Sequence, residues 1–478
     1  MELGYRQLYI NGELRDATGG SRRKIVCPAT EEAAGEIAWA CRQDAEAALE
    51  GARNAFKIWS KTPLIERARW MRVLREAVIE REEDLRLAVM YEMGKPWEAT
   101  AEDYQTVVDS LEWYAEEMRR NRDTVLPDIQ GTHRHEVITQ PVGVVAAFLA
   151  WNFPLLNVGF KLGPALAAGC TIIIRPSSSS PLSAYVLGEI CAKVKFPPGV
   201  INILCGPTGE VAETISTSTI PRALTMIGSS VTGRRLIAQS ATSVKRLSME
   251  LGGNAPVLVF EDADVETAAR EVAALKFGNC GQICVAPNRI FVHDEVYERF
   301  VDLLIGHAKE VRVGFGRGSG ATMGPLIDAK AREYVEELVA SAVDQGGKLS
   351  FGGARPAHLS KGFFYEPTVL ESVTPAMRVF REEIFGPVAP LIPFNDESQV
   401  IDMANDTEYG LVAYVYTRDA ARSRRAADDL EFGEVMVNGF KYAIDLPHGG
   451  IKESGIGKDC SQYALEDYLI RKRITTRC

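Results

Sequence analysis

The sequence predicts an α/β protein with two domains built on parallel sheets and a small projecting β ribbon. Three observations predict this fold. The 478 residues exceed the roughly 250–300 that one compact core usually holds, so the chain is expected to divide. Short β-rich runs alternate with helical periods from 142 and again from 253, which is the pattern of βαβ units. Two strand-like segments, 122–140 and 461–478, fit neither series and are predicted to pair as the ribbon.

The first domain is predicted to comprise 1–121 and 141–252. Residues 45–121 are expected to be helical, because small and aromatic residues recur there on one helical face. The residues on that face are Ala45, Ala48, Ala52, Phe56 and Trp59. Strands are then expected at 143–150, 171–176, 200–206 and 224–229, with helices at 156–169, 181–195 and 232–242 between and after them.

The second domain is predicted to span 253–452. Its expected strands are 255–260, 289–294, 386–394, 411–417 and 434–439, and its clearest helices are 296–311 and 330–345.

Composition limits the possible partners and compartment. A net charge of −10 argues against a nucleic-acid or anionic-membrane partner. The most apolar stretch, 142–160, is interrupted by Asn152 and Pro154 well short of the ~20 residues of a membrane helix. The start resembles no signal or transit peptide, and the nine cysteines form no CxxC, so a reducing, cytoplasmic location is predicted. No cysteine or histidine cluster has metal-ligand spacing, so no metal is expected.

Three residues can carry chemistry. Cys284, in GNCGQICVAPNR, offers a thiol whose thiolate is a nucleophile. Glu250, in MELGG, ends a predicted strand before two glycines and could act as a general base. Asn152, in WNFP, follows a strand and could donate its amide N–H to an oxyanion. Taken singly, each residue type is more often a packing or turn residue.

Glycine-rich turns indicate a nucleotide cofactor. GSSVTG at 228–233 and CGPTGE at 205–210 each follow a predicted strand, where backbone N–H groups can approach a phosphate. Arg175 and Ser178 lie just past another strand, a position suited to a ribose or its phosphate. The first domain is therefore predicted to be a Rossmann-like cofactor domain and the second an α/β catalytic domain.

Seven motifs, in order and spacing, resemble those of the NAD(P)-dependent aldehyde dehydrogenases over nearly the whole chain. They are WNFP (151–154), GPALAAGC (163–170), GSSVTG (228–233), MELGG (249–253), NCGQIC (279–284), EEIFGPV (382–388) and PHGGIKESGIGKD (447–459).

The resemblance implies a role for each matching residue. Cys284 would attack the aldehyde carbon, its backbone N–H and the Asn152 amide would hold the oxyanion, and Glu250 would activate the water that hydrolyses the thioester. Glu383 and Phe385 would hold the nicotinamide ribose. The other residues implied in cofactor binding are Trp151, Gly228, Ser229 and Gly252.

The cofactor is predicted to be NAD or NADP, with NADP somewhat favoured. Arg175 stands where the family usually has lysine, and Ser178 where NAD-preferring members usually have a glutamate that would repel a 2′-phosphate. The alternative is that Arg175 only contacts the ribose and NAD is preferred.

The substrate is predicted to be a small aldehyde. By eye the chain is most similar to succinate semialdehyde dehydrogenases, but Phe160 and Gly278 replace the two arginines that hold the substrate carboxylate there, so that substrate is not expected. The predicted tunnel residues are Phe153, Phe160, Ile283, Val285, Phe440 and His448, the last at a position where phenylalanine is common in the family. Lys441 would favour an anionic substrate and Asp445 a cationic one.

Two other functions stay open. They are a dehydrogenase that passes the thioester to CoA, and a catalytically silent structural member of the fold. The resemblance also implies a homodimer or homotetramer formed through 122–140 and the C-terminal strand. Cys280 is predicted to be a packing residue, with a regulatory disulfide to Cys284 as the alternative.

Overall fold

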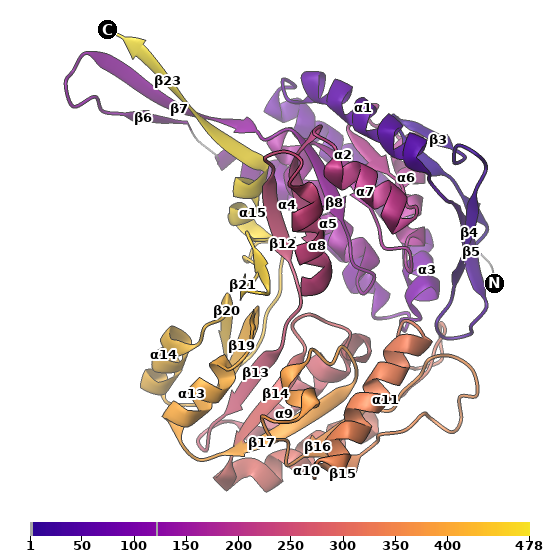
Figure 1. Ribbon diagram of the computed structural model, residues 1–478, viewed down its shortest axis with the longest axis vertical. Coiled ribbons are helices and arrows are strands. Elements are labelled where there is room, and N and C mark those ends of the chain that lie inside the picture. Colours follow the sequence, from indigo (N-terminus) through magenta and orange to yellow (C-terminus); the bar gives the residue numbers. More distant parts are fainter. Residues whose placement is uncertain (1–2, 121–122) are drawn as a thin grey trace.

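The computed structural model describes residues 3–120 and 123–478. Residue 121, where the predicted helical region ends, and residue 122, where the predicted ribbon begins, therefore lie outside the described residues. Figure 1 shows two α/β bodies, with a ribbon that projects from the first of them and carries the C-terminus. The predicted fold class is confirmed.

The first body is built on an eight-stranded sheet. In spatial order its strands are β22 (Gly455–Ile456), β12 (Arg246–Glu250), β11 (Pro221–Ile227), β8 (Val144–Phe148), β9 (Thr171–Arg175), β10 (Ile201–Ile203), β2 (Leu8–Ile10) and β3 (Glu13–Arg15). The five strands from β12 to β10 are parallel, and the outer ones are antiparallel. A run such as β8, in which all five residues are buried, is typical of a parallel sheet covered on both faces.

Helices and a second small sheet complete this body. The helices are α1 (Arg42–Trp59), α2 (Leu64–Glu80), α3 (Glu82–Met93), α4 (Thr100–Glu117), α5 (Pro154–Ala168), α6 (Leu182–Lys193), α7 (Glu213–Thr217) and α8 (Ser230–Ser240). The small sheet has the order β1 (Tyr5–Arg6), β5 (Ala33–Ala38) and β4 (Arg22–Val26). The predicted helical region 45–121 is thus four helices, α1 to α4, and α5, α6 and α8 fall where the periodicity predicts helices, whereas the short α7 was not predicted.

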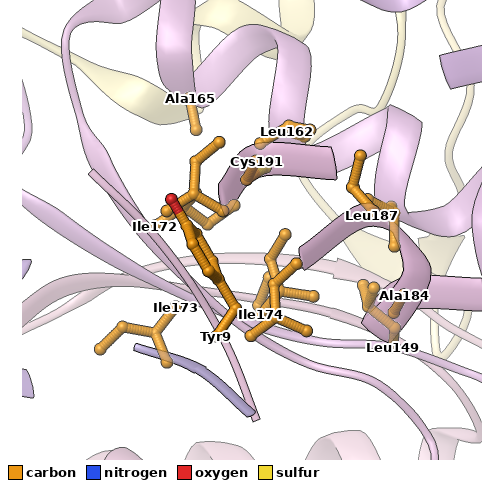
Figure 2. Close-up of a cluster of buried hydrophobic side chains, with 14 of the residues drawn as sticks. Tyr9, Leu149, Leu162, Ala165, Ile172, Ile173, Ile174, Ala184, Leu187 and Cys191 are labelled. Atoms are coloured by element: carbon orange, nitrogen blue, oxygen red, sulfur yellow. The ribbon is translucent and has the colours of Figure 1, made fainter. Parts of the chain in front are cut away.

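Figure 2 shows the core of the first body, where the isoleucines of β9 meet side chains of α5 and α6. Ile172, Ile173 and Ile174 are fully buried. Tyr9 of β2 packs beside them and is almost completely buried. Because β9 is central and apolar on both faces, its carboxyl end, at Arg175, is fixed against the rest of the sheet.

The second body is a seven-stranded sheet. Its order is β15 (Lys348–Phe351), β16 (Thr368–Glu371), β17 (Val388–Phe394), β14 (Pro287–His293), β13 (Ala255–Val259), β19 (Val412–Tyr416) and β20 (Glu434–Val437). All neighbours are parallel except β15 and β16. Its helices are α9 (Val265–Phe277), α10 (Tyr297–Glu310), α11 (Ala329–Asp344), α12 (Arg378–Arg381), α13 (Glu397–Asn405) and α14 (Ala420–Asp429).

After β20, which ends at Val437, the chain returns from the second body to the first. A two-residue pairing joins β18 (Tyr409–Gly410) to β21 (Ile451–Lys452), and β22 then pairs with β12 next to Glu250. This return carries the segment 438–450 across the boundary between the two bodies.

The ribbon consists of β6 (Thr124–Leu126), β7 (His133–Pro141) and β23 (Leu469–Arg477), with β23 antiparallel to β7 over its full length. The predicted pairing of the two segments is confirmed, but the prediction that strand structure begins at 461 is wrong. Residues Ser461–Tyr468 form helix α15, because Ala464, Leu465 and Tyr468 lie on one helical face buried against the first body.

No helix in the described ranges is both long and apolar enough to cross a membrane.

Candidate active site

A cavity of about 530 Å³ is lined by residues of both bodies. The predicted residues that line it are Trp151, Asn152, Phe153, Phe160, Gly228, Ser229, Glu250, Gly252, Ile283, Cys284, Val285, Glu383, Phe385, Phe440 and His448. Arg175 and Ser178 are the two predicted site residues that lie outside it. Residues separated by almost three hundred positions in the sequence therefore converge on one space.

The loop that presents Cys284 has an unusual backbone. Asn279, Cys280 and Gly281 have φ values of 47°, 57° and 70°, a left-handed run that reverses the chain directly after α9. A Cβ at Gly281 would lie 2.1 Å from the carbonyl oxygen of Gly386, so only glycine fits there.

The side chain of Gln282 fixes this loop to the second body. Its amide nitrogen donates to the carbonyl oxygens of Asn279 (3.0 Å) and Pro325 (3.2 Å), and its amide oxygen accepts from the Ile327 backbone N–H (2.9 Å). With every polar atom bonded inside the protein, Gln282 can be almost completely buried. Cys280 is also fully buried and packs in the core of the second body, and both Cys280 and Cys284 are free thiols, as expected for a packing residue.

Asn152 is held at the boundary between the bodies. It lies in the bend between β8 and α5, where Pro154 occupies the first turn of the helix. Its side-chain amide donates to the carbonyl oxygen of Gln282 (3.0 Å), and Asn279 donates in turn to the carbonyl oxygen of Asn152 (3.0 Å). The WNFP bend is therefore hydrogen-bonded directly to the Cys284 loop.

A distant carboxylate caps the start of α5. The backbone N–H groups of Leu155 and Leu156 both donate to Asp103 Oδ1 (3.2 Å each), and Asp103 Oδ2 accepts from Lys95 Nζ (2.6 Å). The pair is completely buried, and Lys95 Nζ lies 3.6 Å from the centre of the Phe153 ring. This cap from α4 satisfies the orphan donors of the helix and fixes the direction of WNFP.

Glu250 ends β12, as predicted, and its side chain is buried. Among the described residues Oε1 has no hydrogen-bond partner. The MELGG turn brings the carboxylate to the cysteine, because a Cβ at Gly253 would lie 2.2 Å from the carbonyl oxygen of Cys284. The Cys284 sulfur, a Glu250 carboxylate oxygen and a ring nitrogen of His448 lie within 4.8 Å of one another.

Cysteine, histidine and glutamate are also zinc ligands. Folding thus assembles a donor set that sequence spacing does not reveal, since the three residues come from three separate elements. That the protein carries no metal stays a prediction.

Glu383 and Phe385 form the other side of the cavity. Glu383 Oε1 accepts from the Gly253 backbone N–H (2.9 Å), and a Cβ at Gly252 would lie 2.8 Å from Glu383 Oε2. The ring of Phe385 packs edge-on to that of Trp151, with centroids 5.4 Å apart. Burial, aided by the charge of Glu250, raises the pKa of Glu383 to about 7, although its backbone hydrogen bond and the buried Lys276 ammonium oppose the shift.

The predicted pyrophosphate turn lies at the amino end of α8. Ser229 caps the helix by accepting from the Thr232 backbone N–H (3.3 Å), and Gly228 N–H donates to the carbonyl oxygen of Glu250 (3.0 Å). Gly228 and Ser229, directly before the first turn of this eleven-residue helix, line the same cavity as the predicted base.

Arg175 and Ser178 follow the end of β9, outside this cavity. Arg175 donates to the carbonyl oxygen of Gly206 (3.2 Å) and to Thr208 Oγ1 (3.1 Å), so it is bonded to the second predicted glycine turn at 205–210. Both residues are partly exposed. They lie at the carboxyl edge of the parallel sheet, where such sheets bind ligands. Trp151 lies at the same edge, after the neighbouring strand β8.

The tunnel side of the cavity contains polar residues that the sequence did not single out. The rings of Phe160 and Tyr442 lie 5.9 and 6.0 Å from that of His448. Lys95, Glu102, Glu434 and Tyr442 also line the cavity. Lys95 and Glu102 lie in the helical region before 121, and Glu434 is the first residue of a strand. None of the three positions carries a local signal of function in the sequence.

The chain was compared with known proteins. The model of the aldehyde dehydrogenase family matches residues 15–474. The chain belongs to the aldehyde dehydrogenase family.

Several individual aldehyde dehydrogenases are similar to the chain. It is 42% identical over 469 residues to glutarate-semialdehyde dehydrogenase of Pseudomonas aeruginosa, an alignment that covers 98% of this chain and 97% of the relative. It is 40% identical over 465 residues to the NADP(+) succinate-semialdehyde dehydrogenase GabD of Escherichia coli, covering 97% and 96%. The solved structure of betaine aldehyde dehydrogenase from Staphylococcus aureus in complex with NAD+ matches with a TM-score of 0.95 and 32% identity, covering 98% of this chain and 94% of that one.

The predicted resemblance is therefore confirmed, and so is the prediction of an NAD(P)-linked oxidoreductase of this family.

Proposed function

We propose that the protein oxidises a small aldehyde to the carboxylic acid, with reduction of NAD or NADP. The convergence of Cys284, Glu250 and Asn152 on one cavity carries the proposal. The three groups supply a nucleophile, a base and an oxyanion donor, which together suffice for acyl chemistry on an aldehyde carbon.

In the first step the Cys284 thiol loses its proton to water, and the thiolate sulfur forms a bond to the aldehyde carbon. The carbonyl π electrons move to oxygen and give a thiohemiacetal oxyanion. The Asn152 amide has a second N–H besides the one bonded to Gln282, and together with the Cys284 backbone N–H it can donate to that oxygen. Because the bend and the loop are bonded to each other, these donors are positioned before substrate arrives.

The cavity fits a dinucleotide. The α8 amino end can receive its pyrophosphate, and Glu383, already held by Gly253 N–H, can accept from a ribose hydroxyl. Trp151 and Phe385 form the adjoining wall. A bound cofactor would supply the hydride acceptor, and loss of hydride from the thiohemiacetal carbon would leave a thioester on Cys284.

Glu250 completes the reaction. Its buried Oε1 has no hydrogen-bond partner among the described residues. It can therefore accept a proton from a water molecule that attacks the thioester carbon. The carbon–sulfur bond breaks, the carboxylic acid leaves and the thiol is restored. A base placed to activate water argues against transfer to CoA, since hydrolysis competes with thiolysis.

The tunnel favours a small aldehyde that is not held by arginine. Phe160 and Gly278 line the cavity where the predicted arginine positions lie, and no arginine is among the described residues that line it. Of the two lysines that do, Lys95 is paired with Asp103, and Lys441 is exposed at the mouth. A single flexible ammonium holds a carboxylate less specifically than a bidentate guanidinium does. Relatives that act on semialdehydes make these anionic aldehydes part of the test.

A direct assay tests the proposal. Purified protein is mixed with NAD or NADP and one of glutarate semialdehyde, succinate semialdehyde, aminobutyraldehyde, lactaldehyde or glycolaldehyde, without CoA. We expect reduced cofactor and the carboxylic acid to appear in equal amounts. A strict requirement for CoA would establish the acylating alternative. Absence of turnover, with Cys284 unreactive toward iodoacetamide, would favour the silent member.

Cofactor choice is expected to depend on the residue at 178. Ser178→Glu should lower the ratio of kcat/KM for NADP to that for NAD by about tenfold or more, because a carboxylate near a 2′-phosphate is repelled. The ratio is measured with one aldehyde at saturating concentration. Ser179→Glu, which adds the same charge one residue further on, is the matched control and should change the ratio less. Equal effects of the two substitutions would show that Ser178 does not face the ribose.

We further propose that 1–121 with 141–252 form the cofactor-binding domain, that 253–452 form the catalytic domain, and that the ribbon joins subunits into a homodimer or homotetramer. The two main sheets support the division, since β12 ends at Glu250 and β13 begins at Ala255. The ribbon supports the assembly, because β6 and most of β23 are exposed and an unprotected sheet edge invites pairing.

A further inference from the structure

His448 touches the catalytic cysteine and base rather than only lining the tunnel. Its Nε2 lies 3.5 Å from Glu250 Oε1, and the ring belongs to the same 4.8 Å cluster as Cys284 Sγ. The side chain is only 11% exposed, so its interactions are little screened by water.

A second carboxylate stands behind the imidazole. Glu434 Oε1 lies 2.9 Å from His448 Nδ1, out of line for a well-formed hydrogen bond but within ion-pair distance. The same oxygen accepts from the Gly449 backbone N–H (2.9 Å), which fixes the carboxylate beside the ring. The backbone of His448 is anchored as well, by reciprocal bonds with Asp459, its N–H donating over 2.8 Å.

The charges around the ring favour its protonated form. Burial by itself would lower the pKa of His448, but the contacts with Cys284, Glu250 and Glu434 raise it well above its ordinary value. For the cysteine the balance is reversed. Burial and the Glu250 charge raise the pKa of Cys284, and His448 is the neighbour that lowers it.

Among the described residues, the other ionisable side chains around His448 and Cys284 do not offer the thiol a cation that would compete with the imidazolium. They are Tyr442, Tyr414, Cys460, Asp459, Lys161 and Lys458. Lys161 is paired with Asp459 (2.5 and 2.7 Å), and Lys458 donates to the carbonyl oxygen of Gly449. Tyr414 and Tyr442 share a hydrogen bond (2.7 Å).

We infer that the His448 imidazolium, held by Glu434, is the counter-ion that stabilises the Cys284 thiolate beside the Glu250 carboxylate. A thiolate next to a carboxylate is disfavoured by like-charge repulsion, and a cation between the two removes that penalty. The Cys284 proton leaves to water, and the thiolate keeps the electron pair with which it attacks the aldehyde carbon. The inference rests on the proposed function, since it takes Cys284 to be the nucleophile.

The pH dependence of Cys284 alkylation tests this inference without substrate or cofactor. The background is Cys41→Ser/Cys478→Ser, because these are the thiols outside the buried set apart from Cys284. The rate of iodoacetamide labelling is followed from acid to alkaline pH, and labelled Cys284 is identified by peptide mapping. The inflection is the readout rather than the rate at one pH, since a more basic thiolate is also more nucleophilic.

His448→Phe is expected to move the inflection to higher pH by about one to two units, the shift typical of losing a nearby opposite charge. Glu434→Gln keeps the shape and the Gly449 acceptor but removes the charge, and should shift the inflection in the same direction by less. Phe160→Leu, which alters another neighbour of the His448 ring without changing charge, is the control and should leave the inflection in place.

An unchanged inflection in His448→Phe, with Cys284 still labelled, would overturn the inference and leave the proposed function standing. Cys284 that resists labelling in the folded background protein would instead contradict its role as nucleophile. If His448→Phe fails to fold, as judged by circular dichroism, the isosteric Glu434→Gln decides, and no shift there overturns the inference.

Discussion

Replacing Cys284 with alanine is expected to reduce aldehyde oxidation by at least about 10⁴-fold, because no covalent intermediate can then form. The structure places this sulfur close to Glu250, on a loop that is hydrogen-bonded to the Asn152 bend. Initial rates of NAD(P)H formation and single-turnover measurements with the best aldehyde of the panel give the ratio directly.

Cys280→Ala is the matched control. Cys280 is fully buried four residues earlier in the same loop, and its change should leave the rate within a few-fold of wild type while costing about 1 kcal/mol of unfolding free energy. If Cys284→Ala kept more than a few per cent of wild-type activity, the thioester route would be wrong.

Glu250→Gln is expected to separate the two halves of the reaction. Loss of the base that activates water should slow turnover by about 10²- to 10⁴-fold. Formation of the thioester needs no attacking water, so a burst of reduced cofactor close to one per active site should precede the slow phase. Stopped-flow absorbance measures the burst, and mass spectrometry of quenched protein detects the acyl group on Cys284.

Glu453→Gln provides the comparison for this variant. Its carboxylate is partly exposed and paired with Arg234 at the edge of the same sheet, so the change should leave the steady-state rate close to wild type. A Glu250→Gln protein without a burst would mean that Glu250 acts before the thioester forms. Restoration of its turnover by CoA would point to the acylating alternative.

The elements that hold the site were predictable because their signals are local. Burial of β8 and β9 on both faces requires uninterrupted apolar runs, and such runs show in the sequence without knowledge of their partners. Catalytic groups at the carboxyl ends of such strands follow from the same pattern, and Glu250 at the end of β12 is an example. Helix α15 was mistaken for a strand because eight residues carry too few helical repeats to outweigh the β-rich tail that follows.

The contacts that make the site work depend on packing between distant segments. The cap that Asp103 provides to α5 needs α4 to lie against it, and a Cβ at Gly163 would come within 2.2 Å of Ser110 Oγ on α4. In the sequence Gln282 is an ordinary polar loop residue, and only the folded structure gives it hydrogen bonds to Pro325 and Ile327. No periodicity encodes such pairs, because each residue satisfies its own segment's pattern equally well without them.

By itself the sequence determined the α/β class, the ribbon and the motifs of an aldehyde dehydrogenase, and it named the residues proposed as nucleophile, base and oxyanion donor. Only the tertiary structure decided which charges surround that nucleophile. His448 reaches Cys284 because the chain crosses back from the second body to the first, where β21 and β22 pair with strands of different sheets, and Glu434 of β20 lies behind its ring. Side-chain chemistry and local periodicity are properties of neighbouring residues, whereas the electrostatic environment of a buried group is set by whatever the whole fold packs against it.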